Sequence, residues 1–399
     1  MKDSFEQTVS CDSKLALEAY DAAVDCQLHA WPGALAALDS ALSTAPDFAL
    51  AHSTRALILL SSGRGPEARE ASSQAQRFGD SVTEREKSHI GIVQLLLEGR
   101  AAHALQAVRA HAKSWPRDAL VISTALGAFG LIAFSGIADH DRVRFDFVQE
   151  LTPHYPKEDP WMLSHRGWVL IETARPEEGL PFVARSLSLR PANGNAAHVM
   201  MHARFELNEP EVALRFADEW LMSYPAHAML FGHIHWHAAL CELDLDHIEQ
   251  ALSRLTTVIE PHLAYAPPLV GLTDTTALLW RLRLQGRAGL SWLEAQRFAA
   301  AKFPQGGNVF AELHLAMLAA GLHSAKELQA CGARVQKQSD AGHAGAAVVE
   351  RWVDALTALL GQDSLTARAA LQACTAEAVR IGGSHAQRTI INRTLAWLN

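Results

Sequence analysis

The chain has 399 residues, of which 49% are hydrophobic and 20% charged, and its formal net charge at pH 7 is −8. It contains no run of about twenty uninterrupted apolar residues, which excludes a membrane-spanning helix. The acidic balance argues against binding to nucleic acid, because proteins that contact the phosphate backbone usually present a basic face.

The N-terminal stretch MKDSFEQTVSCDSK lacks the apolar core of a signal peptide. The five cysteines are scattered and form no CxxC pair. We therefore expect reduced thiols and a cytoplasmic location.

Small residues recur at fixed distances before a series of helix stops. Ala34, Leu38 and Ala41 lie twelve, eight and five residues before the first stop. The stops are Pro46, Asp80, Pro116, Pro156, Pro191, Pro225 and Pro261, separated by 34, 36, 40, 35, 34 and 36 residues. This period is typical of tetratricopeptide repeats, in which two antiparallel helices cross at small residues.

The segments within each repeat predict helices and no sheet. Residues 47–60, 82–99, 118–134 and 275–286 carry apolar side chains at helical spacing, and no alternating run or Asn-Gly hairpin signal is present. We expect an all-α, right-handed superhelical solenoid. We expect regular repeats in residues 1–262, and irregular helix pairs with a C-terminal cap, continuous with the solenoid, in residues 263–399. The reason is that the distance from Pro261 to the next stop, Pro304, is 43 residues, longer than any earlier spacing.

Four histidines share one phase of the repeat. His198 and His202 follow Pro191 by seven and eleven residues, and His233 and His237 follow Pro225 by eight and twelve. Both are i, i+4 pairs on the first helix of a repeat, the helix that lines the concave surface, so the two rings of each pair should point the same way. Asp274 and His314 are expected at similar depth on the following first helices.

This set of residue types suits three kinds of chemistry. Neutral imidazoles with one carboxylate, namely His198, His233, His237 and Asp274, could bind a divalent transition metal such as Zn or Fe. The same residues could bind an anion, or could perform general acid–base catalysis near neutral pH. The alternative is that they are core histidines bonded to neighbouring carbonyl groups. The HxxxH pairs lack the Glu of HExxH, so a zincin mechanism is not supported.

At several of these segments the chain resembles the tetratricopeptide repeat protein 38 family. The segments are PDFALAHSTRALILL, TEREKSHIGIV, NAAHVMM, GHIHWHAAL, TDTTALLWRL, ELHLAML and IGGSHAQRTIINRTL. The similarity runs from about residue 15 to residue 397. The residues that match the family's motifs by position are His198, His233, Trp236, His237, Asp274, Trp280, Arg281, His314, Gly382, Gly383, Ser384, Gln387 and Arg388. The resemblance implies the repeat fold and a site at these positions, and it implies no particular reaction.

The chain also departs from the family pattern. Gly194, Met201 and Thr389 stand where the family usually has His, Glu and Asp. Two polar partners around His198 are therefore missing, and His202 is a candidate local replacement.

The C-terminal motif predicts a helix break followed by a last helix. Gly382 and Gly383 should end one segment, with Ser384 as the N-cap of the next. Gln387 and Arg388 in its first turn could bind a carboxylate or phosphate. The alternative is a terminal cap in which Arg388 pairs with a neighbouring acid.

Two classes of function follow. The first is a binding protein whose concave pocket takes a small anionic ligand or a peptide or protein partner, with His202, Trp236, Arg281, His314, Ser384, Gln387 and Arg388 as ligand-binding candidates. The second is an enzyme that uses the His/Asp cluster for metal-assisted or general acid–base, hydrolase-like chemistry. We expect no nucleic-acid or membrane partner, and the sequence leaves a homodimer open.

Overall fold

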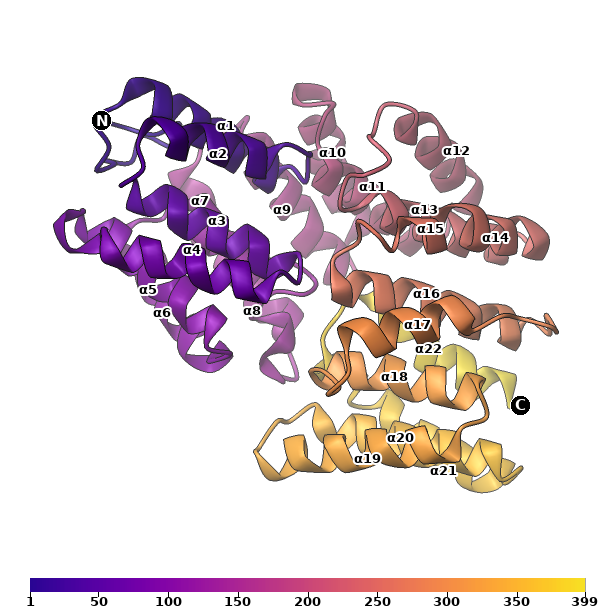
Figure 1. Ribbon diagram of the computed structural model, residues 1–399. Coiled ribbons are helices and arrows are strands. Elements are labelled where there is room, and N and C mark those ends of the chain that lie inside the picture. Colours follow the sequence, from indigo (N-terminus) through magenta and orange to yellow (C-terminus); the bar gives the residue numbers. More distant parts are fainter. Residues whose placement is uncertain (399) are drawn as a thin grey trace. The chain divides into compact units, whose positions relative to one another are not determined.

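The computed structural model describes residues 1–398, and these residues form helices joined by short turns (Figure 1). No β-strand occurs among them; the residues Lys2 and Thr8 form an isolated antiparallel bridge. No helix in the described chain is both long and apolar enough to cross a bilayer. The predicted all-α class of helix pairs is confirmed.

The chain forms two compact units. The first comprises Met1–Ile132, Val143–Leu170 and Glu178–Val199, and the second Ala133–Arg142, Ile171–Glu177 and Met200–Asn399. This division does not test the predicted change from regular to irregular repeats at residue 262, which stays a prediction.

The first unit begins with helices that pack in consecutive pairs. They are α1 (Lys14–Leu28), α2 (Ala34–Thr44), α3 (Ala49–Ser61), α4 (Gly65–Arg77), α5 (Glu84–Leu97), α6 (Ala101–Ser114) and α7 (Ala119–Leu126). Helix α1 packs on α2, α3 on α4 and α5 on α6. The four helices that follow divide their residues between the units: α8 (His140–Leu151), α9 (Pro160–Glu172), α10 (Pro176–Leu189) and α11 (Gly194–Glu206). Short 3-10 segments are η1 (Gly79–Ser81), η2 (Ala133–Ser135), η3 (Thr152–His154) and η5 (Ala378–Ile381).

The small residues that recur before the predicted stops form the buried stripe of the second helix in the first pairs. In α2 the buried residues are Ala34, Leu38 and Ala41, the three positions counted from Pro46. In α4 Ala68 and Ser72, which lie twelve and eight residues before Asp80, are buried in the same way. Small side chains let the two helix backbones of a pair approach closely.

The turn inside several pairs contains a residue in the left-handed conformation. Gly63 has φ +73° and Gly99 has φ +70°, values that glycine adopts at little cost. At the same point of later pairs the chain places larger residues, including His323 (φ +54°) and Gln362 (φ +61°). Polar side chains therefore project from turns where glycine would present none.

The second unit continues with α12 (Pro210–Leu221), α13 (Phe231–Asp244), α14 (Ile248–Arg254), the π-helical η4 (Leu255–Ile259), α15 (Glu260–His262), α16 (Pro268–Leu284), α17 (Leu293–Lys302), α18 (Val309–Gly321), α19 (Ala325–Asp340), α20 (Ala346–Leu360), α21 (Ser364–Thr375) and α22 (His385–Trp397). Pro261 lies inside α15, shortly after the π-helical turn, and the helix ends one residue later, at His262. Proline has no N–H to donate, and a π-helical turn shifts the bonding to i+5.

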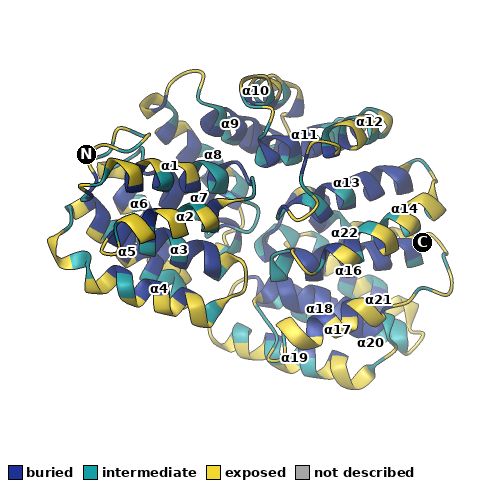
Figure 2. Ribbon diagram, turned by 45° about the horizontal axis from the view of Figure 1, so that its top comes forward, coloured by how far each residue is buried: buried dark blue, intermediate teal, exposed yellow. Residues whose placement is uncertain are grey.

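Three helices form the centre of the second unit. In α16 every residue from Val270 to Leu282 is buried, and in α18 every residue from Val309 to Ala320. In α13 the residues from Gly232 to Leu243 are buried except His235. Figure 2 shows these helices mostly in dark blue. Because they are enclosed on all sides, polar side chains on them sit in the interior.

Candidate metal centre

The histidines predicted to share one phase lie on α11 and α13. His202 is on α11, with His198 one turn earlier, and His233 and His237 are one turn apart on α13. His202, His233 and His237 are buried. The i, i+4 spacing aligns the two rings of each pair along one helix face.

Asp274, on α16, contacts His233. Both carboxylate oxygens lie 2.9 Å from His233 Nδ1, and the pair is buried. In this contact His233 Nδ1–H donates to the carboxylate, so Nε2 carries no proton in the neutral ring. A carboxylate behind an imidazole in this way fixes the ring and its tautomer.

The other rings contact one another edge to face. The ring centroids of His202 and His237 are 4.4 Å apart, and those of His233 and His237 are 4.9 Å apart. His202 Nδ1 lies 3.5 Å from Oε1 of Glu172, at the end of α9. A second carboxylate thus stands behind a second imidazole.

Four imidazoles come together here. One nitrogen from each of His198, His202, His233 and His237 lies within 4.8 Å of the others, a spacing that could hold a metal ion. Asp274, which the sequence predicts as the fourth ligand, is not in this group, because its carboxylate contacts Nδ1 of His233. The fourth member of the group is His202. The residues fit a transition metal, because imidazoles bind Zn and Fe, three of the four are buried, and a carboxylate lies next to Nδ1 of His233 and of His202.

Trp236 and Arg281 lie beside the histidine rings. The Trp236 indole is stacked on His233, with centroids 5.4 Å apart and planes 8° from parallel. The Arg281 guanidinium carbon is 5.6 Å from the Trp236 ring centroid. Arg281 is buried, its Nη2 donates to the Ala386 and Thr389 oxygens at 2.9 and 3.0 Å, and its burial lowers its pKa to about 9. The Trp236 indole therefore contacts both His233 and Arg281.

His314, on α18, is outside the group of four. Its Nδ1 donates to the Phe310 carbonyl oxygen at 2.8 Å, and its Nε2 is buried without a hydrogen-bond partner in the described chain. Burial lowers the pKa of His314 to about 4, with a further contribution from Arg281. His314 is thus a neutral core histidine bonded to a carbonyl group.

The C-terminal motif forms a helix cap. Ser384 and Gln387 make a capping box at the start of α22, each accepting from the other's backbone N–H. Arg388 donates to Asp141 Oδ2 at 3.0 Å and to the Gly383 carbonyl oxygen at 2.5 Å. The structure therefore shows the alternative stated for Arg388, a pairing with a neighbouring acid, and a ligand-binding role for these three residues stays a prediction.

Sequence reasoning missed the carboxylates around this centre. Glu172 also accepts from the His385 N–H at 2.9 Å, and His385 Nδ1 lies 2.8 Å from Glu206 Oε1. The Glu206 carboxylate raises the pKa of His385. Glu172 is thirty residues from His202, and no local motif marks it, so only the packing of α9 could have revealed it.

The first unit contains a second buried charge cluster that was also missed. Asp118 accepts from Arg85 Nη1 at 2.9 Å and lies 3.2 Å from a nitrogen of both His89 and His111. Its neighbours hold the pKa of the Asp118 carboxyl well below its ordinary value, although burial by itself acts to raise it. The cluster is enclosed and ties α5, α6 and the start of α7 together.

No protein-family model matches the chain. Among solved structures it is similar to the human IFIT1 dimer with m7Gppp-AAAA, with 10% sequence identity and a TM-score of 0.41, over 98% of this chain and 87% of that one. A likeness at this level supports no conclusion about function. The resemblance to the tetratricopeptide repeat protein 38 family stays a prediction, while the helix-pair architecture is directly visible.

Proposed function

We propose that this helical-repeat protein binds one divalent transition-metal ion through the imidazoles of His198, His202, His233 and His237. The observation that supports this most is the convergence of four imidazole nitrogens within 4.8 Å. Imidazole binds zinc at about 2.0–2.1 Å, so the four rings would have to turn their nitrogens toward a common point to bind one ion. The donor set contains no thiolate, which suits Zn or Fe.

The charge around the group supports the same proposal. Asp274 is 2% exposed, and its only ion-pair partner in the described residues is His233. A buried carboxylate is costly unless a positive charge compensates it. A divalent ion bound to His233 Nε2 would supply a positive charge that compensates the Asp274 carboxylate on the other side of the ring.

The ion would also give the protein a place for a small anionic ligand. When bound, such an ion polarises ligand oxygens and lowers the pKa of a coordinated water. Around it, this chain's residues exclude bulk water and orient the rings, with Asp274 holding a proton on His233 Nδ1. Binding of a small anion at this centre is the finer function that we propose, in preference to a peptide or protein partner.

Metal-assisted hydrolysis is the second candidate. It is favoured by the two carboxylate–imidazole contacts, Asp274 with His233 and Glu172 with His202, because such pairs also perform general acid–base chemistry. Hydrolysis of simple phosphate and carboxylate esters that appears only in metal-loaded protein, and disappears in His237→Ala, would favour this candidate over binding alone.

The test of the metal proposal is elemental analysis of the purified protein after removal of metal by a chelator and reloading with Zn²⁺ or Fe²⁺. The wild type should retain one equivalent, and His237→Ala should bind at least about 100-fold more weakly, since loss of a ligand exceeds the 10–100-fold effect of losing a supporting group. His103→Ala, an exposed histidine on α6, is the matched control. A wild type without stoichiometric metal, or a His237→Ala variant that binds like the control, would overturn the proposal.

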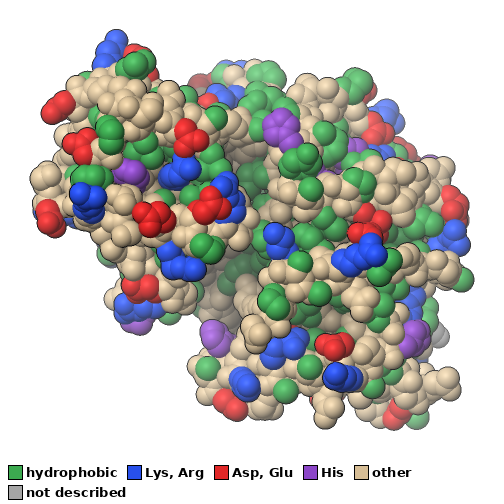
Figure 3. Space-filling view, in the orientation of Figure 1, with side chains coloured by type: hydrophobic (Ala, Val, Ile, Leu, Met, Phe, Trp, Pro, Cys, Tyr) green, Lys and Arg blue, Asp and Glu red, His purple; other side chains and the backbone are tan. Residues whose placement is uncertain are grey.

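Three further expectations stay predictions. Figure 3 shows acidic and basic side chains interspersed on one face of the molecule, which supports the expectation of no nucleic-acid partner. A cytoplasmic location is expected, and homodimer formation stays open. Light scattering during size exclusion, with and without a short RNA, measures both the mass and the RNA binding.

A further inference from the structure

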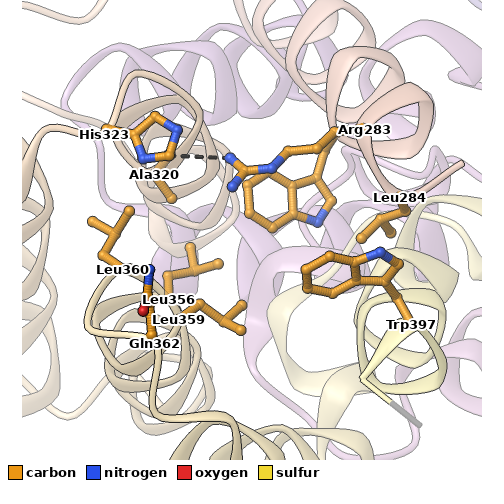
Figure 4. A pocket seen from close by; sticks show the side chains of 10 residues that line it. Arg283, Leu284, Ala320, His323, Leu356, Leu359, Leu360, Gln362 and Trp397 are labelled. Atoms are coloured by element: carbon orange, nitrogen blue, oxygen red, sulfur yellow. Dashed lines mark hydrogen bonds between the residues drawn. The ribbon is translucent and has the colours of Figure 1, made fainter. Parts of the chain in front are cut away.

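A cavity lies in the C-terminal part of the second unit, apart from the histidine group. Its volume is about 230 Å³. It is enclosed by α16, α18, α20 and α22 and lined by Trp280, Arg283, Leu284, Ala320, His323, Leu356, Leu359, Leu360, Gln362 and Trp397. Figure 4 shows the leucines of α20 on one side, the Trp397 indole on the other and the Arg283 side chain above.

The lining includes an arginine that has no counterion. Arg283 is half-buried, makes no ion pair in the described part of the chain, and donates one long bond of 3.4 Å to the Ala320 carbonyl oxygen (Figure 4). Its guanidinium carbon is 5.3 Å from the centroid of the Trp280 ring, and burial lowers its pKa. A guanidinium that is partly removed from water, without a carboxylate, is incompletely compensated.

A neighbouring cavity extends the positive surroundings. It also measures about 230 Å³, shares Leu284 and Trp397 with the first, and is lined by Arg281 and Arg393. The Nε and Nη1 atoms of Arg281 are buried and have no hydrogen-bond partner among residues 1–398. Arg393 pairs with Asp244 at 2.7 Å. The two cavities together present three guanidinium groups, and neither has a carboxylate in its lining.

We propose that the cavity between α16, α18, α20 and α22 binds a small aromatic carboxylate, with its ring among Trp397 and the leucines and its carboxylate on Arg283. The volume lies below the range of drug-sized sites, which limits the ligand to about a dozen non-hydrogen atoms. Leucine and indole surfaces favour an aromatic body. A guanidinium favours a carboxylate, because it can donate two parallel hydrogen bonds to it.

The test is ligand-observed NMR titration with indole-3-acetate, compared with the neutral and similarly shaped indole-3-acetamide. For a ligand of this size the acid should bind with a Kd of about 1 mM or lower, and the amide about tenfold or more weakly, because it cannot form the charged hydrogen bonds. Arg283→Gln should weaken binding of the acid to the level of the amide. Arg297→Gln, an exposed arginine on α17 paired with Glu294, is the control and should bind like the wild type.

The same titration separates this site from the metal centre. Binding of indole-3-acetate should be unchanged by a chelator and in the His237→Ala variant. Equal binding of acid and amide, an Arg283→Gln variant that binds like the wild type, or no saturable binding of the acid at tenfold above the expected Kd would each overturn the proposal. Arg283→Lys gives a further check in a variant that keeps the charge: it should bind the acid more weakly than the wild type and more tightly than Arg283→Gln.

Discussion

Replacing Asp274 by asparagine exchanges one carboxylate oxygen for an amide nitrogen and leaves the volume of this buried side chain nearly unchanged. In the wild type both oxygens lie 2.9 Å from His233 Nδ1. The variant keeps one acceptor oxygen and loses the negative charge. If the amide turns its nitrogen to the ring, it instead favours a proton on Nε2, the nitrogen that the metal requires.

The size of the effect follows from the role of the carboxylate. Removing a group that orients a metal-bound histidine typically costs 10–100-fold in metal affinity, or about 1.4–2.7 kcal/mol. Asp274 is buried and accepts from the ring with both oxygens, so we expect the upper half of this range. The free energy of unfolding of the metal-free protein should change less, because the shape of the side chain is kept.

The assay is a competition titration against a chelator of known zinc affinity. Asp354→Asn, an exposed change on α20, makes the same chemical substitution away from the centre. We expect Asp274→Asn to bind Zn²⁺ about 30–100-fold more weakly than the wild type and Asp354→Asn to match it. If Asp274→Asn binds as tightly as the wild type, the carboxylate does not orient His233 for a metal, and the reasoning from this contact is refuted.

Three further changes test the fold. Asp118→Asn removes the negatively charged partner of buried Arg85, so the free energy of unfolding in urea titrations should fall by at least about 3 kcal/mol. The pKa of Asp118 is lowered in the folded state, so the wild type should lose this stabilisation only as the pH falls below about 4. In the wild type the free energy of unfolding should decrease as the pH falls from about 6.5 to 4, because the pKa of His314 is about 4 in the folded state and the unfolded chain therefore binds the proton first. In His314→Leu this decrease should be smaller, and a pH profile like that of the wild type would contradict the reasoning. Gly383 has φ +75°, and an added Cβ would lie 2.6 Å from Phe310. Gly383→Ala should therefore lower the melting temperature by an amount equivalent to about 1–3 kcal/mol. An unchanged melting temperature would show that the turn relaxes to accept the methyl group.

Much of the fold could be predicted because the repeat is a local property. Leu38 and Ala41 are buried where the count from Pro46 places them, and no β-strand forms in residues 1–398. Helical periodicity and small residues at crossing points are visible in a window of one repeat. A π-helical turn precedes Pro261, and the helix there ends one residue after the predicted stop, at His262.

The candidate site could be predicted only in part. The phase of His233 and His237 on α13 follows from their spacing, and so does that of His202 relative to His198. The phase does not say which group stands behind each ring. The sequence predicts Asp274 as a metal ligand, whereas its carboxylate contacts Nδ1 of His233, and no local pattern predicts Glu172 beside His202.

The sequence by itself therefore determined the helix pairs, their period and the faces on which the histidines lie, because these depend on neighbours within about one repeat. Only the tertiary structure decided the partners of those histidines, the pairing of Arg388 with Asp141 and the cavity beside Arg283. These contacts join residues up to 247 positions apart, and their geometry depends on how whole helices pack.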